Sequence, residues 1–301
     1  MNFCMTELAD NNANSYAKFL KSKGKKVFEL GGVAWMKYHG ALISASAMPV
    51  YVDLTCEEAV QMVKESKALF LRYTTGPMTS PTNWWNMICR DYDFNKLSPS
   101  TRSKIRRGMH RHEIKQVGPE WLVKKGYECY VKCYSRYKHA MPKSRSEYDS
   151  ILHGLIGQSL FDIWACTKNK ELKGYVVCIV EKSGVFMHTI DITPAGLHDY
   201  AAYATIHQLL EYYVNKKKLP VSNGSRSISH ETNIQDFLQK LGFEREYSEL
   251  HAIYRPDVKI VVELLYPFRN IINKFNNFSL FHKMSSVLFQ EEIIRNNKNA
   301  Y

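Results

Sequence analysis

The chain has 301 residues, 45% of them hydrophobic and 13% aromatic, and a formal net charge of +12. This composition is typical of a well-packed globular protein and excludes a disordered one, and no apolar run approaches the length of a membrane span. We therefore expect a cytoplasmic, non-spanning protein whose charge favours an anionic partner, namely a nucleotide cofactor, RNA or an acidic membrane surface.

The seven cysteines are odd in number and scattered along the chain. Cys129 and Cys133 have the spacing of one helix face, but no matching second pair lies nearby. The pattern predicts reduced core thiols and no metal site.

The first hundred residues alternate short apolar runs with glycine turns. Residues 26–45 therefore predict antiparallel hairpins. Thr55 and Glu58 form a capping box that opens a helix to about Ser66, and residues 68–73 follow as a strand. Residues 74–95 contain two prolines and few periodic apolar positions, so we expect a surface loop there.

A strongly basic helix is predicted after this loop, with Ser98 as its cap and Pro99 at its first position. Its basic side chains, with no acid between them, are Arg102, Lys104, Arg106, Arg107, His110, Arg111 and His112. A solvated helix face explains this run, and so does contact with phosphate or RNA, because a nearby anion would relieve the mutual repulsion. A second helix over 119–139 and a polar linker over 138–146 are expected next.

The second half predicts strands over 161–166, 174–181 and 185–192, an amphipathic helix over 199–214 and a strand from Leu219 to Gly224. A polar loop leads to a helix that Thr232 or Asn233 caps, and Gly242 ends that helix. The order is three strands, a helix, a strand, a helix and a returning strand.

This order, together with the phrase Phe237-Leu238-Gln239-Lys240-Leu241-Gly242-Phe243, resembles the GNAT superfamily of acyltransferases. The resemblance implies an α+β fold with a mixed, mostly antiparallel twisted sheet flanked by helices. A cut-down sheet before the basic helix resembles the doubled GNAT arrangement of the FemABX aminoacyltransferases. We expect an incomplete N-terminal subdomain over 1–100, a basic helical linker over 101–147, a GNAT-like domain over 148–257, and a helical tail over 258–301 that packs back on the N-terminal part.

The resemblance implies a donor with phosphates bound at a helix N-terminus, either acyl-CoA or aminoacyl-tRNA, and an amine-bearing acceptor. Only Gly196 fits the family's pyrophosphate loop, and Asp199 would repel phosphate. Leu238 occupies the position of the tyrosine that serves many GNAT enzymes as general acid. Arg102, Arg106 and Arg107 are candidates for contact with the donor.

The loop from Arg226 to Glu231 lies where the fold opens. His230 and Glu231 are candidates for a base and its orienting carboxylate, with His188 as a further catalytic candidate and Asp191 beside it. The candidates for donor binding here are Arg226, Ser227, Ser229 and Asn233. The alternative is a loop whose polar groups only cap the next helix.

Two functions follow from this pattern. The first is an N-acyltransferase that moves an acyl or aminoacyl group from CoA or tRNA to an amine. The second is a catalytically silent GNAT-like module that binds RNA or an anionic membrane surface through its basic helix. Peripheral membrane contact is therefore one of the predicted interactions.

Overall fold

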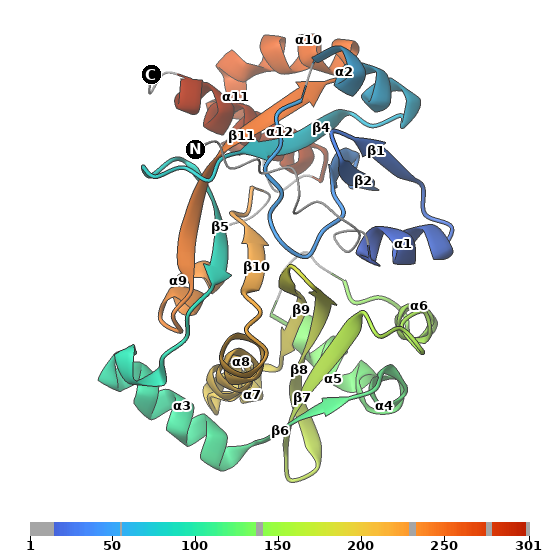
Figure 1. Ribbon diagram of the computed structural model, residues 1–301. Helices are drawn as coiled ribbons and strands as arrows, with labels where there is room; N and C mark the ends of the chain where they lie inside the picture. The colour runs from blue at the N-terminus through green and yellow to red at the C-terminus, as the bar shows by residue number, and fades with distance from the viewer. Residues whose placement is uncertain (1–14, 55, 137–140, 229–232, 275–278, 299–301) are drawn as a thin grey trace, which may run out of the picture. The chain divides into compact units, whose positions relative to one another are not determined.

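The computed structural model describes residues 15–54, 56–136, 141–228, 233–274 and 279–298 (Figure 1). Within them the chain forms two compact units. The described residues within 1–87, 224–235 and 245–301 belong to the first unit, and those within 88–223 and 236–244 belong to the second.

The first unit is a mixed sheet with helices. Its strands are β1 (Val27–Leu30), β2 (Val33–Tyr38), β3 (Ala41–Ser44), β4 (Phe70–Thr75), most of β11 (Glu244–Tyr254) and the first part of β5 (Trp84–Cys89). β3 and β4 are parallel, whereas β1 with β2, β2 with β3, and β4 with β11 are antiparallel. Its helices are α1 (Ser15–Ser22), α2 (Cys56–Glu65), α10 (Pro256–Leu265), the 3-10 turn Tyr266–Phe268, α11 (Arg269–Lys274) and α12 (Ser279–Lys298).

The second unit is also a mixed sheet, in the order β10-β9-β8-β7-β6. Its strands are β6 (Glu113–Val117), β7 (Phe161–Lys168), β8 (Glu171–Glu181), β9 (Gly184–Ile192) and the first part of β10 (Val221–Ser225). Only β10 with β9 is parallel; the pairs β6 with β7, β7 with β8 and β8 with β9 are antiparallel.

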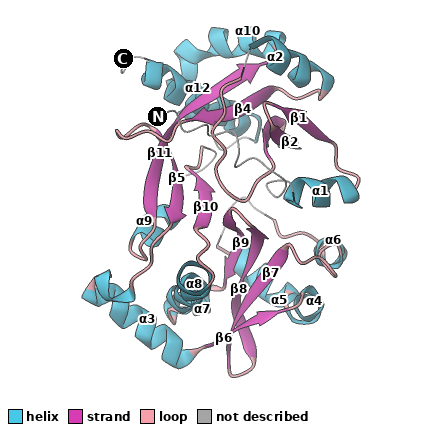
Figure 2. Cartoon of the chain, in the orientation of Figure 1, coloured by secondary structure: helices cyan, strands magenta, loops and turns pink. Residues whose placement is uncertain are grey.

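Helices cover both faces of this second sheet, with α5 on β8 and β9 and α8 on β7 and β8 (Figure 2). The helices are α3 (Pro99–Arg111), α4 (Pro119–Lys125), α5 (Tyr127–Tyr134), α6 (Arg145–His153), α7 (Pro194–His198), α8 (Ala201–Leu210), the π-helical turn Glu211–Lys216, the 3-10 turn Phe94–Lys96 and most of α9 (Ile234–Gln239). The α+β class and the mixed sheet are therefore confirmed.

The expected loop over 74–95 contains a strand, β5. Trp84 and Met87 are buried in it, and the main-chain N–H of Arg226 donates to the carbonyl oxygen of Trp85 over 2.9 Å. These partners lie far away in the sequence, so the local pattern, with Pro77 and Pro81 nearby, does not reveal the strand.

The single helix expected over 119–139 is two helices, α4 and α5, that meet at Gly126. A Cβ atom there would lie 2.1 Å from the Tyr148 hydroxyl and 2.6 Å from the Leu122 carbonyl oxygen. The close packing of α6 against this point therefore requires glycine.

Residues 101–147, expected as a linker, contribute to the second unit, because α3 packs on α8 and β6 pairs with β7. The returning strand β11, expected in the 148–257 domain, pairs with β4 in the first unit. The tail packs in that unit too, since Val262, Ile272 and Leu288 share a buried cluster with Ala41 and Phe70. Thr55, the expected cap, lies outside the described residues.

A buried polar chain ties α12 to the sheet of the first unit. Arg72 Nε donates to Gln290 Oε1 over 2.7 Å, and Gln290 Nε2 donates to the Tyr254 hydroxyl over 3.2 Å. Burial lowers the pKa of Arg72 to about 10. Gln290 is fully buried, so its amide is a main partner of a desolvated guanidinium.

Replacing Gln290 by Leu is expected to lower the free energy of unfolding by about 2–3 kcal/mol, because the Arg72 guanidinium then lacks a buried acceptor. Urea unfolding followed by circular dichroism measures this change. The matched variant Asn270→Leu, at an exposed position of α11, is expected to change it by less than about 0.5 kcal/mol. Equal effects of both variants would contradict the structural role of Gln290.

None of the described helices combines the length and the apolar character that crossing a bilayer requires.

Candidate functional site

Strands β9 and β10 of the second unit part after a short paired stretch. Val221 pairs with Val185, and Ser222 pairs with Phe186. Both strands are wholly described, and β9 then continues for six residues to Ile192 without further pairing to β10. The edge of β9 that faces β10 is therefore open from residue 187 onwards.

A β-bulge lies where the two strands part. Val177 pairs with Thr189 and Cys178 pairs with Met187, so His188 is an extra residue on β9. Its side chain is exposed, and Nδ1 lies 3.1 Å from Thr189 Oγ1. Although solvent reaches the ring, the protein atoms around it desolvate it and lower the pKa of His188 below its usual value. The bulge thus places the His188 imidazole at the open end of the strand pair.

The loop after β9 uses its glycine for packing. Thr193 caps α7, and its Oγ1 accepts a hydrogen bond of 3.0 Å from the Gly196 N–H. A Cβ atom on Gly196 would lie 2.6 Å from the Lys173 carbonyl oxygen. The N–H of Gly196, expected to bind the donor, is therefore already donated within the loop.

The next helix, α8, begins without a side-chain cap. Tyr200 precedes it in the left-handed conformation, with φ +67°. The Tyr200 side chain accepts from none of the N–H groups in the first turn of α8, and these groups form the positive end of a helix dipole. Such an end is suited to an anion.

The basic helix α3 lies directly against the start of α8. Ser98 caps α3 by accepting from the Thr101 N–H. A Cβ atom on Gly108 would lie 2.5 Å from the Tyr200 carbonyl oxygen and 3.0 Å from the Ala204 Cβ. Only glycine permits this approach of the two helices.

The close packing brings three cations of α3 to the first turn of α8. The guanidinium groups of Arg107 and Arg111 lie 4.7 and 5.7 Å from the centre of the Tyr200 ring. Lys104 Nζ lies 5.5 Å from the Tyr203 ring. The helix end and these side chains therefore add their positive potentials at one place.

Asp199, expected to repel phosphate, is neutralised in the structure. It accepts a hydrogen bond from Lys168 and lies 3.4 Å from Arg111 Nη1. The Lys168 ammonium is the main reason that the pKa of Asp199 lies below its usual value, and Arg111 adds to this effect. The site is positive overall, since Lys104, Arg107, Arg111 and Lys168 outnumber this one carboxylate.

The other two arginines predicted on α3 have different surroundings. Arg106 is exposed, with its guanidinium 5.4 Å from the Phe94 ring. Arg102 is half-buried, and its Nε has no hydrogen-bond partner in the described part of the chain. Arg107 is thus the predicted arginine that the structure places at the start of α8.

Arg226, a further predicted donor contact, belongs to the first unit. Its guanidinium stacks 4.7 Å from the Trp85 ring, and Nη1 donates to the Asn83 carbonyl oxygen over 2.8 Å. Arg245 lies 4.4 Å from the same ring. Burial, followed by repulsion from Arg245, lowers the pKa of Arg226.

Of the other residues predicted in this loop, the structure describes some and not others. Ser227 is half-buried in the first unit, and Asn233 is exposed just before α9. Ser229, His230 and Glu231 lie outside the described residues. Their roles stay predictions.

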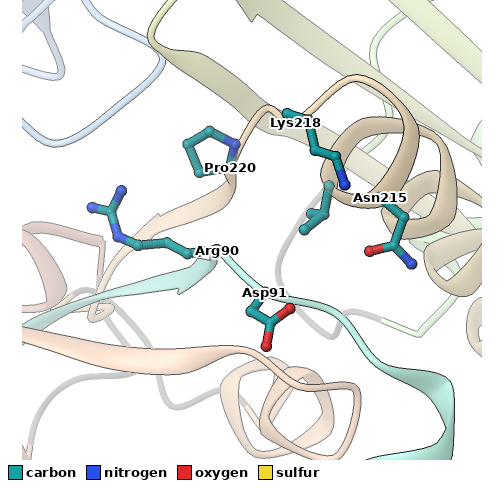
Figure 3. Close-up of a pocket in the computed structure, with 6 residues that line it drawn as sticks. Arg90, Asp91, Asn215, Lys218 and Pro220 are labelled. Atoms are coloured by element: carbon teal, nitrogen blue, oxygen red, sulfur yellow. The ribbon is translucent and has the colours of Figure 1, made fainter.

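A separate pocket of about 230 Å³ lies in the second unit before β10 begins (Figure 3). Its lining residues are Arg90, Asp91, Val214, Asn215, Lys218 and Pro220. The Pro220 carbonyl oxygen accepts from the Val185 N–H at the paired end of β9 and β10. The pocket therefore lies at the opposite end of the strand pair from the bulge, and it is not part of the candidate site.

Sequence reasoning missed Tyr200, Tyr203 and Lys168 as site residues. Both tyrosines have the spacing of ordinary helix positions, and Lys168 has the appearance of a turn residue. A left-handed tyrosine before a helix has no sequence signature, since this conformation favours glycine or asparagine. In the described ranges no cluster of three or more His, Cys, Asp or Glu side chains is arranged to hold a metal ion.

No family model matches the chain, and no curated protein matches it in sequence. Solved structures do match. The C-terminal domain of a protein named as a lysylphosphatidylglycerol synthetase, from Agrobacterium fabrum, aligns with a TM-score of 0.55 and 10% identity over 83% of this chain and 90% of its own. The structure of FemX aligns with a TM-score of 0.55 and 8% identity over 83% and 93%.

A conserved protein of unknown function from Bacteroides thetaiotaomicron also aligns, with a TM-score of 0.55 and 9% identity over 80% of this chain and 90% of its own. At such identities the likeness concerns the fold. The chain has a FemABX-like GNAT fold.

Proposed function

We propose that the protein transfers an acyl or aminoacyl group from a phosphate-bearing donor, acyl-CoA or aminoacyl-tRNA, to an amine. The observation that carries this proposal is the parting of β9 and β10 at a bulge, followed by a helix start that Tyr200 leaves without a side-chain cap and that has cations of α3 beside it. An open strand edge and an anion site follow each other along the chain, as a long donor with a carbonyl at one end and phosphates at the other requires.

The phosphate end of the donor binds at the first turn of α8. Lys104, Arg107 and Arg111 lie beside that turn, against the rings of Tyr200 and Tyr203. The balance of charge, with Asp199 already paired to Lys168, favours an added anion.

The carbonyl end of the donor lies against the open edge of β9. There the amine nitrogen attacks the carbonyl carbon, the new C–N bond forms, and the C–S bond of a thioester or the C–O bond of an aminoacyl ester breaks. The leaving sulfur or ribose oxygen takes a proton, while a base removes one from the amine. His188, exposed at the bulge, is the proposed base among the described residues. His230 with Glu231 is the second pair proposed for this step.

Removing two cations of the site tests where the donor binds. The double variant Lys104→Ala with Arg107→Ala is expected to weaken binding at least about tenfold and to reduce its salt dependence, because two phosphate contacts are lost. Isothermal titration calorimetry with CoA and fluorescence anisotropy with labelled tRNA, each at several salt concentrations, measure this change and identify the donor class.

The matched control removes two exposed lysines from another helix of the same unit, Lys124→Ala with Lys125→Ala on α4. This control lowers the net charge of the protein by the same amount as Lys104→Ala with Arg107→Ala. It is expected to leave the binding of CoA and tRNA nearly unchanged. Equal losses in both double variants would show that the overall charge attracts the ligand, and would contradict a site at α8.

Two observations favour a catalytically silent, RNA-binding module as the second candidate. The Gly196 N–H is committed to Thr193, and Leu238 is fully buried at the position expected for a tyrosine acid. This candidate predicts salt-dependent tRNA binding without transfer from any acyl or aminoacyl donor. Transfer of a labelled acyl group to an amine would exclude it.

A further inference from the structure

An exposed apolar stripe lies on three consecutive elements of the first unit, α10, the 3-10 turn Tyr266–Phe268 and α11. Figure 1 shows the backbone of α10 and α11. Five large apolar side chains in this stretch are between 51% and 67% exposed: Ile260, Val261, Leu264, Phe268 and Ile271. Within α10, Leu264 follows Ile260 by four residues and Val261 by three, so these three side chains share one side of that helix. Phe268 lies in the 3-10 turn that follows, and Ile271 lies in α11.

The opposite side of the same helices is already packed. Val262 is 5% exposed and Ile272 is 7% exposed, and both share a buried cluster with Phe70 and Tyr254 of the sheet. The helices are therefore held in place by one apolar side while the other faces outward. Such a second stripe is uncommon on a soluble surface and typically marks an interaction site.

The charges around the stripe favour an anionic surface. From Arg255 to Lys274 the chain has four basic residues, Arg255, Lys259, Arg269 and Lys274, and two acidic ones, Asp257 and Glu263. Arg255 pairs with Asp257, Lys259 lies 4.0 Å from Glu263, and Arg269 lies 3.4 Å from Glu292 of α12, so the local excess of positive charge is small. The whole chain has a net charge of +12. A second copy would bring the same positive charge to the contact, whereas a bilayer with acidic headgroups would attract it.

The shape of the stripe agrees with this choice. Its side chains are more than half exposed, so they project from the helices and do not line a groove. A protein partner would need a complementary groove for them, but the boundary between lipid headgroups and acyl chains accepts projecting apolar side chains of any arrangement. Phe and Leu side chains flanked by basic residues are the composition of helices that lie in this boundary.

We propose that α10, the 3-10 turn Tyr266–Phe268 and α11 dock the protein on an anionic bilayer surface, with Leu264 and Phe268 inserted among the lipids and Lys259 and Lys274 near the headgroups. The surface is separate from the donor site of the second unit. The proposal does not depend on the transfer reaction.

Co-sedimentation with vesicles tests the docking. Wild-type protein is expected to bind vesicles of phosphatidylcholine with about one-third phosphatidylglycerol, and to bind pure phosphatidylcholine at least about tenfold more weakly. The double variant Leu264→Ser with Phe268→Ser is expected to lose binding to the anionic vesicles by at least about tenfold, because two apolar side chains no longer insert.

The matched control replaces two exposed apolar residues of the second unit, Met141 and Ile151, by Ser. This control is expected to bind vesicles as the wild type does. Affinity of both double variants for CoA and tRNA is measured in parallel and is expected to stay unchanged, which separates this test from that of the donor site.

Three outcomes would overturn the proposal: no binding of wild type to anionic vesicles, equal binding to the two vesicle types, or equal loss in the stripe variant and its control. Sedimentation that shows a wild-type dimer, converted to a monomer by Leu264→Ser with Phe268→Ser, would instead assign the stripe to a second copy.

Discussion

Replacing His188 by Ala is expected to lower the turnover of acyl transfer about 10²- to 10⁴-fold while the melting temperature stays nearly the same. The loss is that of a positioned general base. The fold is retained because the side chain is exposed and its polar contact is with the neighbouring Thr189. Transfer of a radiolabelled acyl group to an amine, with whichever donor binds, measures the turnover.

The dependence of the transfer rate on pH shows whether His188 acts as a base or only shapes the bulge. A base acts in its neutral form, which predominates above its pKa. Because the pKa of His188 lies below the usual value for histidine, the wild-type rate is expected to rise with pH in the acidic range and to level off at a lower pH than an ordinary histidine base would give. His188→Ala is expected to lose this rise along with its rate.

His153→Ala is the matched control, since His153 is an exposed histidine on α6 that hydrogen-bonds the Asp149 carbonyl oxygen. It should retain both the rate and the profile. If His188→Ala also retains them, His188 is not the base. His230→Ala, prepared in parallel, then decides whether the loop after β10 supplies it.

Replacing Gly108 by Val is expected to lower the free energy of unfolding by about 3 kcal/mol and to abolish measurable donor binding. A Cβ atom at this position would lie 2.5 Å from the Tyr200 carbonyl oxygen, which belongs to the backbone and cannot rotate away. Helices α3 and α8 must then separate, and the first turn of α8 moves away from Arg107. Thermal and urea unfolding measure the stability, and titration with CoA and tRNA measures the binding.

Gly108→Ala gives a sharper test of the same contact. In an exposed helix, alanine in place of glycine stabilises by about 1 kcal/mol, so a destabilisation of about 1–2 kcal/mol here would show that the clash outweighs helix propensity. Ser100→Ala, at an exposed position of the same helix, is expected to change stability by less than about 0.5 kcal/mol. A stabilised Gly108→Ala variant would contradict the close packing of α3 and α8.

Much of the local structure follows from the sequence, because it depends on residues that are close together in the chain. The Ser98-Pro99 pair begins α3 as expected, with the serine hydroxyl accepting from the Thr101 N–H. Gly242, expected to end the helix before Phe243, has φ +88°. Such signals need only a few neighbouring residues, and the order of elements built from them was sufficient to predict the α+β class and the GNAT-like fold.

For the candidate site, the sequence predicts some features and misses others. The sequence identifies the basic run on α3 and His188 on β9, because charge and residue type are visible without a structure. It does not identify the anion site, which depends on the approach of Gly108 to Tyr200 and on the left-handed backbone of Tyr200. These features arise from packing between segments about ninety residues apart.

The sequence by itself determined the positive charge, the helix starts and ends, and the order of strands and helices, all of which follow from composition and short-range patterns. Only the tertiary structure decided that β5 forms in the expected loop, that Arg107 meets the start of α8, and that Arg226 stacks on Trp85 in the first unit. The physical reason is that these outcomes depend on which distant surfaces bury each other, and a local pattern carries no record of its partner.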